Sequence, residues 1–307
     1  MGWFDGFHAR DFELGDVRIH ARTGGRADGA PLLLIHGYPQ THAIWQRVAR
    51  ELAGEFFLVM PDLRGYGRSS QPPGEPDHAN YSKRAMAADL VALMRALGRE
   101  RFAVCGHDRG GRVAHRMALD HPAVVEKLCL IDIAPTLAMY EATDMAFARA
   151  YYHWFFLIQP APLPERLIGA EPRFYLHQKL GGWGSQGLAH IEPEALADYE
   201  RWYCAPAGEG GLPPGVHAAC EDYRASAGVD LEHDRASRAA GERIGCPLHL
   251  LWGERGVVAR LFDPLRLWRE ASAAPVSGRA LPAGHFIPEE LPAETAAELR
   301  GFLGGGR

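Results

Sequence analysis

The segment that most constrains this sequence joins a buried strand to a helix through closely spaced glycines. Residues 102–106 form an apolar run, and residues 106–110 then read Gly-His-Asp-Arg-Gly. Because glycine lets two backbones approach closely, this pattern is typical of a strained turn that projects its central side chain above a sheet. The central residue is Asp108, at the start of a helix whose dipole favours a negative charge. The segment therefore predicts a carboxylate presented above the end of a strand.

Asp108 has two interpretations. As a nucleophile, its carboxylate attacks saturated carbon by displacement and leaves an alkyl ester on the protein. Alternatively, Asp108 only caps the helix predicted over residues 110–119. The other segments of the sequence that carry chemistry favour the nucleophile.

The rest of the chain predicts a parallel sheet. Several short apolar runs end at Gly, Pro, Asp or His, as buried parallel strands do, and a helical pattern over residues 82–97 separates two of them. Strands that alternate with helices imply a sheet covered on both faces, with the ligand at the carboxyl ends of the strands. The predicted strands are residues 32–36, 56–61, 102–106, 127–133 and 248–253.

The alternation stops after Asp132. Residues 135–235 are rich in aromatic and helix-forming residues, and strand signals resume at Pro247. A helical insertion between two strands of the sheet explains this change. We expect a core formed by residues 1–134 and 237–307, with a helical cap over residues 135–236 that covers the strand ends.

Three further segments agree with the glycine-flanked aspartate in order and spacing. Residues 36–39 read His-Gly-Tyr-Pro, which resembles a loop that supplies an oxyanion-hole amide. Residues 61–69 resemble the glycine-containing turn after the next strand, and His285 lies in Ala-Gly-His-Phe after the last predicted strand region. Together these segments predict the α/β-hydrolase fold, in which His285 is the expected catalytic histidine.

The acidic partner of His285 has two candidates. Glu254 follows the strand after which many proteins of this fold carry the acid, but it lies close to the strand end. Asp132 ends the preceding strand within an apolar run, where a charged side chain would be costly to bury without a partner. We favour Asp132 as the acid. The alternative is that its side chain only accepts hydrogen bonds from the first helical turn of the inserted domain.

Two arginines follow the nucleophile. Arg109 comes directly after Asp108, and Arg112 shares a helix face with Asp108 at the i+4 spacing. Their guanidinium groups would keep Asp108 ionised and match the geometry of a substrate carboxylate. The alternative is that one or both arginines pair with surface acids.

The predicted cap contains an aromatic run at residues 151–156, most of which should face the core. His153 and Trp154 differ from their neighbours because each carries an N–H group that can donate inside a dry pocket, and Tyr223 could add a hydroxyl. A departing fluoride ion is small and strongly hydrated, so its release needs several such donors.

Composition excludes some classes of partner. A net charge of -5 over 307 residues argues against nucleic acid, and no run of 18 apolar residues suggests a membrane span. The five cysteines are scattered without a C-x-x-C motif, and the first residues do not resemble a signal peptide. We therefore expect reduced thiols and a cytoplasmic location.

These motifs together resemble the fluoroacetate (haloacetate) dehalogenase family of α/β-hydrolases. The resemblance spans most of the chain, and its most specific elements are the arginine after the nucleophile and the adjacent His-Trp pair of the cap. Haloalkane dehalogenases and many epoxide hydrolases carry tryptophan where Arg109 stands.

The resemblance implies a hydrolytic dehalogenase that acts on short 2-haloacids through an aspartyl ester. It implies no cofactor and no metal, and it suggests a homodimer. The implied roles are nucleophile for Asp108, general base for His285, acid for Asp132, carboxylate binding for Arg109 and Arg112, halide binding for His153, Trp154 and Tyr223, and an oxyanion hole formed by the backbone amides of Tyr38 and Arg109.

Two rivals remain at this point. An epoxide hydrolase would use the same three catalytic residues together with cap tyrosines such as Tyr151, Tyr152 or Tyr223. It has no need of the two arginines. A non-catalytic receptor on this fold would tolerate the loss of a catalytic residue, whereas Asp108, Asp132 and His285 are all present.

Overall fold

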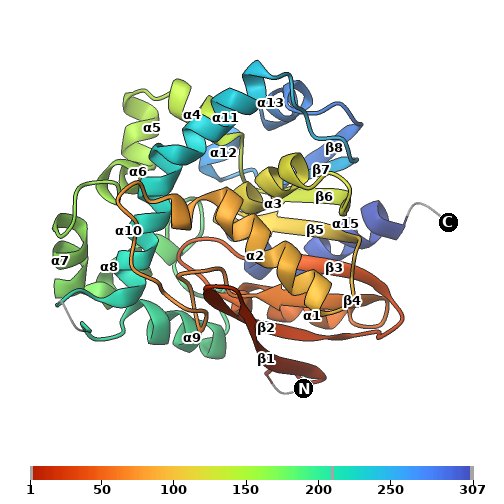
Figure 1. The fold of residues 1–307 in the computed structure, drawn as a ribbon, viewed down its shortest axis with the longest axis horizontal. Coiled ribbons are helices and arrows are strands. Elements are labelled where there is room, and N and C mark those ends of the chain that lie inside the picture. The colour runs from red at the N-terminus through yellow and green to blue at the C-terminus, as the bar shows by residue number, and fades with distance from the viewer. Residues whose placement is uncertain (1–2, 209–210, 305–307) are drawn as a thin grey trace.

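The computed structural model describes residues 3–208 and 211–304, and these contain one eight-stranded sheet (Figure 1). The strand order is β1-β2-β4-β3-β5-β6-β7-β8; β3 to β8 are parallel, whereas β2 runs antiparallel to both β1 and β4. The strands are β1 Phe7–Leu14, β2 Val17–Gly25, β3 Ala30–Ile35, β4 Phe56–Pro61, β5 Phe102–His107, β6 Val125–Ile131, β7 Leu248–Gly253 and β8 Val276–Leu281.

The five predicted strands are all present, within two residues of the predicted bounds at each end. The sequence analysis missed β1 and β2, and it gave no bounds for β8, the last strand region before His285. Most side chains of β1 are exposed, so this strand lacks the apolar run by which the buried strands were identified. The predicted α/β class with a mostly parallel sheet is confirmed.

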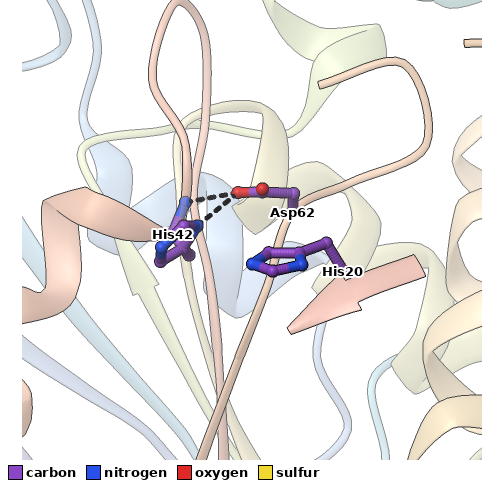
Figure 2. Close-up of side chains that lie close together, drawn as sticks. All are labelled: His20, His42 and Asp62. Atoms are coloured by element: carbon purple, nitrogen blue, oxygen red, sulfur yellow. Dashed lines mark hydrogen bonds and ion pairs between the residues drawn. The ribbon is translucent and has the colours of Figure 1, made fainter. Parts of the chain in front are cut away.

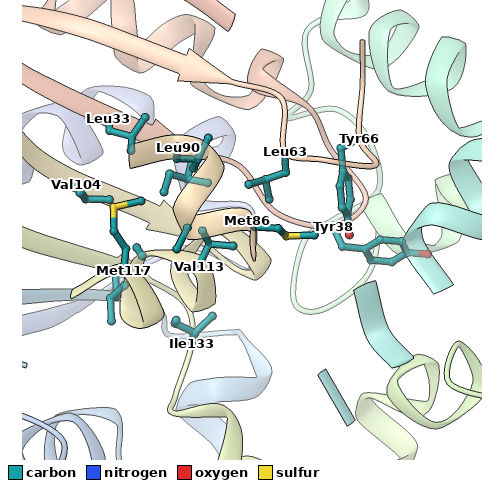
Figure 3. Close-up of a cluster of buried hydrophobic side chains, with 14 of the residues drawn as sticks. Leu33, Tyr38, Leu63, Tyr66, Met86, Leu90, Val104, Val113, Met117 and Ile133 are labelled. Carbon is teal, nitrogen blue, oxygen red and sulfur yellow. The ribbon is translucent and has the colours of Figure 1, made fainter. Parts of the chain in front are cut away.

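Successive residues of each parallel strand point to opposite faces, and each face has its own apolar core. Leu33 and Val104 pack with α2 (Lys83–Ala96) and α3 (Arg109–Asp120), whose Met86, Leu90, Val113 and Met117 are buried in the cluster of Figure 3. On the opposite face Leu34 and Cys105 pack with α1 (Gln46–Leu52) and α15 (Pro292–Gly304). Both cores hold the sheet rigid beneath the strand ends.

The helix predicted over residues 82–97 is α2, and it begins after Ser82, whose hydroxyl accepts a hydrogen bond from the Ala85 amide at 3.2 Å. Two short helices lie in the first half of the chain: η1 (His42–Trp45) follows β3, and η2 (Ala79–Tyr81) precedes α2. Three more lie near the last two strands: α12 (Val257–Leu261), α13 (Pro264–Glu270) and α14 (Ile287–Glu290).

Eight helices lie between β6 and β7 in the described residues, and Figure 1 shows most of them grouped beside the sheet. The predicted cap bounds at residues 135 and 236 remain a prediction, and the last of these helices ends slightly later, at Ala239. None of the described helices is long and apolar enough to cross a membrane. The cap helices are α4 Thr136–Glu141, α5 Met145–Ala150, α6 Tyr152–Phe156, α7 Leu163–Ala170, α8 Pro172–Leu180, α9 Pro193–Tyr203, α10 Pro214–Ala227 and α11 Val229–Ala239.

Candidate active site

Asp108 occupies a sharp turn between β5 and α3. Its backbone has φ 48° and ψ -118°, which is strained for a residue with a side chain. The turn requires its glycines: a Cβ at Gly106 would lie 2.4 Å from the Gly110 carbonyl oxygen, and one at Gly110 would lie 2.3 Å from that of His36. The Asp108 side chain makes no capping hydrogen bond to α3, so the helix-cap interpretation is wrong.

The two carboxylate oxygens of Asp108 have different surroundings. Oδ1 accepts a hydrogen bond from the Tyr38 amide at 2.9 Å, whereas Oδ2 lies 3.7 Å from Nε2 of His285. Burial alone would raise the pKa of Asp108, but the positive charges of His285 and the neighbouring arginines lower it below its ordinary value. Asp108 is therefore ionised at neutral pH, with Oδ1 held and Oδ2 facing the histidine.

His285 is oriented by Asp132 and not by the alternative acid. Its Nδ1 lies 2.6 Å from Oδ2 of Asp132, and the Gly253 amide donates to Oδ1 of Asp132 at 3.1 Å. Glu254 is exposed. A carboxylate at Nδ1 favours the tautomer with its proton there, which leaves Nε2 free to accept a proton on the Asp108 side.

Arg109 is held by an acid that the sequence analysis did not identify. Its Nε and Nη2 donate to the two carboxylate oxygens of Asp222, at 3.0 and 2.7 Å, and Nη2 also donates to the Asp222 carbonyl at 2.9 Å. The guanidinium lies over the Tyr223 ring, 4.1 Å from its centroid. Nη1 is buried without a partner. The acid is thus buried and not on the surface, and it leaves one guanidinium nitrogen unused.

Arg112 has no acidic partner in the described part of the chain. Its Nη1 donates to the Thr136 hydroxyl at 2.8 Å, and the guanidinium lies over the Trp154 ring, 4.7 Å from its centroid. Its Nε is buried without a partner. Burial and the charge of Arg109 lower the pKa of Arg112 from its ordinary value. Pairing with a surface acid is therefore wrong for Arg112.

The three predicted halide ligands surround this region on the cap side. The His153 ring lies 5.6 Å from that of Tyr223 and 6.0 Å from that of Tyr38, while Trp154 stacks on Tyr151 at 5.8 Å. The Tyr223 hydroxyl and Nδ1 of His153 are buried without hydrogen-bond partners. Burial lowers the pKa of His153 well below its ordinary value, so the ring is neutral and donates through one nitrogen.

Two further residues complete the site. Asp222 also accepts hydrogen bonds from the Tyr66 hydroxyl at 2.5 Å and from the Lys83 ammonium. Trp183 has φ 53°, and its ring lies 4.7 Å from that of His153 and 5.2 Å from that of His285. The acidic pair at residues 221–222, next to the apolar stretch at residues 218–220, was the available sequence signal for Asp222. Trp183 lay in a glycine-rich joint with no such signal.

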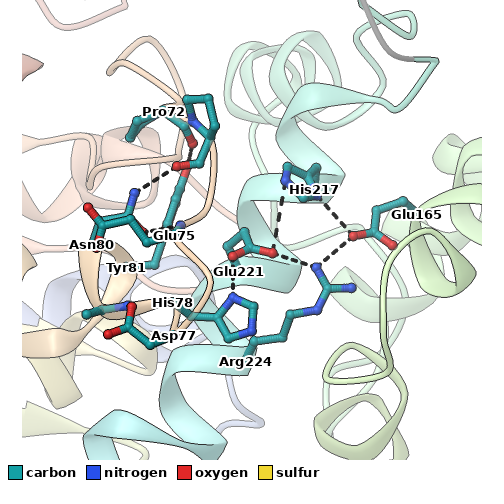
Figure 4. A network of polar contacts seen from close by, with 12 residues as sticks. Pro72, Glu75, Asp77, His78, Asn80, Tyr81, Glu165, His217, Glu221 and Arg224 are labelled. Carbon is teal, nitrogen blue, oxygen red and sulfur yellow. Dashed lines mark hydrogen bonds and ion pairs between the residues drawn. The ribbon is translucent and has the colours of Figure 1, made fainter.

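A polar network fixes the helix that carries Asp222 and Tyr223 (Figure 4). Nη1 of Arg224 donates to Glu165 at 2.8 Å and to Glu221 at 2.7 Å, which ties α10 to α7. Glu221 also lies 2.6 Å from Nδ1 of His78, next to η2 in the core. The network therefore fixes α10 against both the cap and the core.

A separate cluster of His20, His42 and Asp62 has a spacing compatible with a metal ion (Figure 2). However, Oδ1 of Asp62 accepts from both the amide and Nδ1 of His42 at 2.8 Å, and Oδ2 accepts from the Arg68 amide at 2.9 Å. The carboxylate is thus used by three N–H donors that shape the turn after β4. We interpret the cluster as structural.

Comparison of the sequence and the fold with known proteins places this chain in a family. Residues 30–229 match the family model of the alpha/beta hydrolase fold. The chain is 46% identical over 304 residues to a fluoroacetate dehalogenase from Burkholderia sp, covering 99% of this chain and 96% of that protein. It is 30% identical over 281 residues to a soluble epoxide hydrolase from Corynebacterium sp. (strain C12), covering 91% of each.

A solved structure from Nostoc sp PCC 7120, provisionally assigned as an alpha/beta hydrolase, matches with a TM-score of 0.93. The two chains are 51% identical, and the match covers 98% of this chain and 99% of that one. The order of the motifs, the fold and nearly full-length similarity thus agree. The chain belongs to the haloacetate dehalogenase family of the α/β-hydrolase superfamily.

Proposed function

We propose that this protein hydrolyses the carbon–halogen bond of short 2-haloacids and converts fluoroacetate to glycolate and fluoride. The observation that carries the proposal is an ionised Asp108 oxygen facing His285, beside two buried arginines that each keep an unused N–H donor. The 46% identical Burkholderia protein, named a fluoroacetate dehalogenase, supports the same substrate class.

The first step is a displacement at the carbon that bears the halogen. Because the Tyr38 amide holds Oδ1, the attacking atom is Oδ2 of Asp108. A bond forms between Oδ2 and the substrate Cα, the carbon–halogen bond breaks, and the halide leaves with the bonding electron pair. The product is an ester of Asp108, and a chiral carbon is inverted.

The arginines orient the substrate for this attack. Nη1 of Arg109 and Nε of Arg112 are the unpaired donors, and they can bind the two oxygens of a substrate carboxylate. Such positioning can contribute several kcal/mol to lowering the barrier. The halide leaves toward the cap, where His153, Trp154 and Tyr223 offer hydrogen-bond donors.

The second step hydrolyses the ester. Nε2 of His285 takes a proton from water, and the resulting hydroxide attacks the Asp108 carboxyl carbon. Negative charge collects on Oδ1, which the Tyr38 amide already contacts and toward which the Arg109 amide, at the first position of α3, can donate. Collapse breaks the ester bond, and the proton on His285 passes to the departing 2-hydroxy acid.

An epoxide hydrolase is the second candidate function. The buried, unpartnered hydroxyl of Tyr223 would suit an epoxide oxygen, and the Corynebacterium relative carries that name. The two arginines favour an anionic substrate instead. A receptor role is disfavoured because the geometry of Asp108, His285 and Asp132 suits catalysis.

The proposal includes the setting of the reaction. It requires one small-molecule substrate and no cofactor. We propose a cytoplasmic location, which is supported by the five scattered cysteines, all of them free thiols. A homodimer follows from the family resemblance alone.

Halide release is the direct test of the function. Incubation with fluoroacetate or chloroacetate should release fluoride or chloride, measured with ion-selective electrodes, together with one equivalent of glycolate. A small epoxide serves as the control substrate. Faster diol formation from the epoxide than halide release from either acid would contradict the proposal and favour the second candidate.

Substitution of the base should separate the two steps. His285→Asn should permit displacement but block ester hydrolysis, because only hydrolysis needs a general base. Mass spectrometry of peptides should then find a carboxymethyl group on Asp108. The matched control is Glu254→Gln, which should turn over normally because Glu254 is exposed and does not orient His285. Full turnover by His285→Asn would remove His285 from this role.

The pH dependence should report the Asp132–His285 pair. Burial opposes protonation of His285, but the hydrogen bond and charge of Asp132 raise its pKa above the ordinary 6.5. His285 must be neutral to act as base, so turnover should be lost as the pH falls through this raised pKa. Asp132→Asn should move the acidic limb of the pH–activity profile to lower pH and reduce kcat on the order of a hundredfold or more. If the acidic limb stays at the same pH in this variant, Asp132 is not the acid that raises the pKa of His285.

Asp222 should control substrate affinity through Arg109. Asp222→Asn removes the charge that holds the guanidinium, so KM for chloroacetate should rise about tenfold or more while kcat changes less. The matched control is Asp230→Asn: Asp230 accepts from the Lys83 amide at 2.8 Å and lies 3.4 Å from its ammonium, without a contact to Arg109. Equal KM values in the two variants would assign Asp222 a purely structural role.

A further inference from the structure

A second cationic group lies in the cap, outside the catalytic centre. Lys179 is near the end of α8, and the residue is only 5% exposed. Its ammonium lies 3.9 Å from the centroid of the Tyr152 ring, 5.2 Å from that of Tyr175 and 5.5 Å from that of Trp183. Within residues 3–208 and 211–304, no carboxylate or hydrogen-bond acceptor pairs with it. We call these four residues the lysine cage.

An ammonium in this position lacks a counter-charge. The attraction between a cation and aromatic rings compensates for part of the hydration energy that the cation loses on burial. A buried charge is nevertheless ordinarily paired with an opposite charge. Lys83, which is buried to a similar degree, contacts both Asp222 and Asp230. Burial lowers the pKa of Lys179 to about 8, so at neutral pH the group is still mainly charged. The positive charge of the lysine cage is therefore not balanced by an ion pair with any described residue.

The aromatic ring of Trp183 lies between the ammonium of Lys179 and the rings of His153 and His285. Trp183 contacts both His153 and His285, at 4.7 and 5.2 Å between ring centroids, and the Tyr152 ring lies 6.3 Å from that of His153. The charge of Lys179 contributes to the lowered pKa of His153, second to burial. Nδ1 of His153 is buried without a partner, so an unused donor lies on the same side of the site.

The lysine cage also reaches the protein surface. Tyr152 is 46% exposed, and Trp183 is partly exposed. By contrast, Asp108 is 9% exposed and His285 only 1%, so a substrate must cross a covering layer to reach them. In the proposed reaction the substrate and both products are anions. The cation of Lys179 contacts the exposed Tyr152 ring on one side and, on the other, the Trp183 ring that lies next to His153, so it can attract such anions.

We propose that the lysine cage is a second binding site, for a small monovalent anion. It would hold the carboxylate of an incoming haloacid or a departing halide between solvent and the catalytic centre. This role rests on the proposed function for its choice of ligand. The site itself rests on the ammonium of Lys179, a residue only 5% exposed that has no ion pair in the described part of the chain, and on its contacts with Tyr152 and Trp183.

Two substitutions of Lys179 separate charge from packing. Lys179→Met keeps a flexible apolar chain inside the rings and removes the charge, whereas Lys179→Arg keeps the charge. If the lysine cage recruits the substrate, kcat/KM for chloroacetate should fall about tenfold in Lys179→Met and recover in Lys179→Arg. If it serves release, competitive inhibition by added bromide should weaken at least as strongly.

The matched control is Lys127→Met. Lys127 lies on β6 of the core; its ammonium is 5.6 Å from the centroid of the Phe302 ring and donates to the carbonyls of Phe302 and Leu303, which both belong to α15. This variant also loses a cation–aromatic contact, so its Tm should fall. Its kcat/KM and bromide inhibition should match those of the parent protein, because Lys127 contacts no residue of the site.

A binding measurement keeps this proposal separate from the proposed function. Bromide quenches tryptophan fluorescence on contact, and Trp183 is part of the lysine cage. Titration of the parent protein with bromide should show saturable quenching that is lost in Lys179→Met and retained in Lys179→Arg and Lys127→Met. Loss of this quenching in Lys179→Met alone would support the anion site, even if the parent protein released no halide from haloacids.

Other outcomes would overturn the proposal. If Lys179→Met lowers Tm but leaves kcat/KM, bromide inhibition and bromide quenching at parental values, Lys179 only stabilises the cap. If Lys179→Arg is as impaired as Lys179→Met in all three measurements, the positive charge is not the property that matters, and the anion site is wrong.

Discussion

The buried ion pair between Asp222 and Arg109 is the interaction on which the site depends most. Without Asp222, neither Arg109 nor Arg112 would have an acidic partner in the described residues, and Lys83 would keep only its contact with Asp230. Breaking a buried ion pair by removing one partner typically costs about 3–5 kcal/mol, because the remaining charge is stranded. Asp222 pairs with Arg109 and Lys83 and leaves Arg112 without an acid. Arg112 therefore keeps its positive charge without an ion pair in the described residues, at the place where a substrate carboxylate is proposed to bind.

The core and the cap contribute different parts of this arrangement. The core supplies the reacting groups from the ends of β5 and β6 and from the loop after β8, where two packed apolar layers hold the backbone rigid. The cap supplies Asp222 and the aromatic side chains that cover the arginines. Because the network around Arg224 ties α10 to both parts, a small shift of the cap would move Asp222 and Tyr223 together.

The sequence predicted those parts of the site that depend on local backbone geometry. The turn at Asp108 could be predicted because a tight turn requires glycines at fixed positions. The strand that precedes Asp132 could be predicted because a buried strand requires a run of apolar residues. The Asp222–Arg109 pair was not predicted, since it joins residues 113 positions apart through the packing of α10 on the core. Trp183 and Lys179 were missed for a related reason: nothing in their own segments indicates which rings and charges they meet.

The nature of the leaving group separates the two candidate functions of this site. An epoxide keeps its oxygen attached after ring opening, so it needs an O–H donor at one point and no recognition of a negative charge. A haloacid brings a carboxylate that must be bound and expels a second anion that must be solvated. In the proposed function Arg109 and Arg112 meet the first requirement, and both are buried so deeply that they would be costly to retain for a neutral ligand. The positive charges, more than the nucleophile, are therefore what favour a haloacid over an epoxide as the proposed substrate.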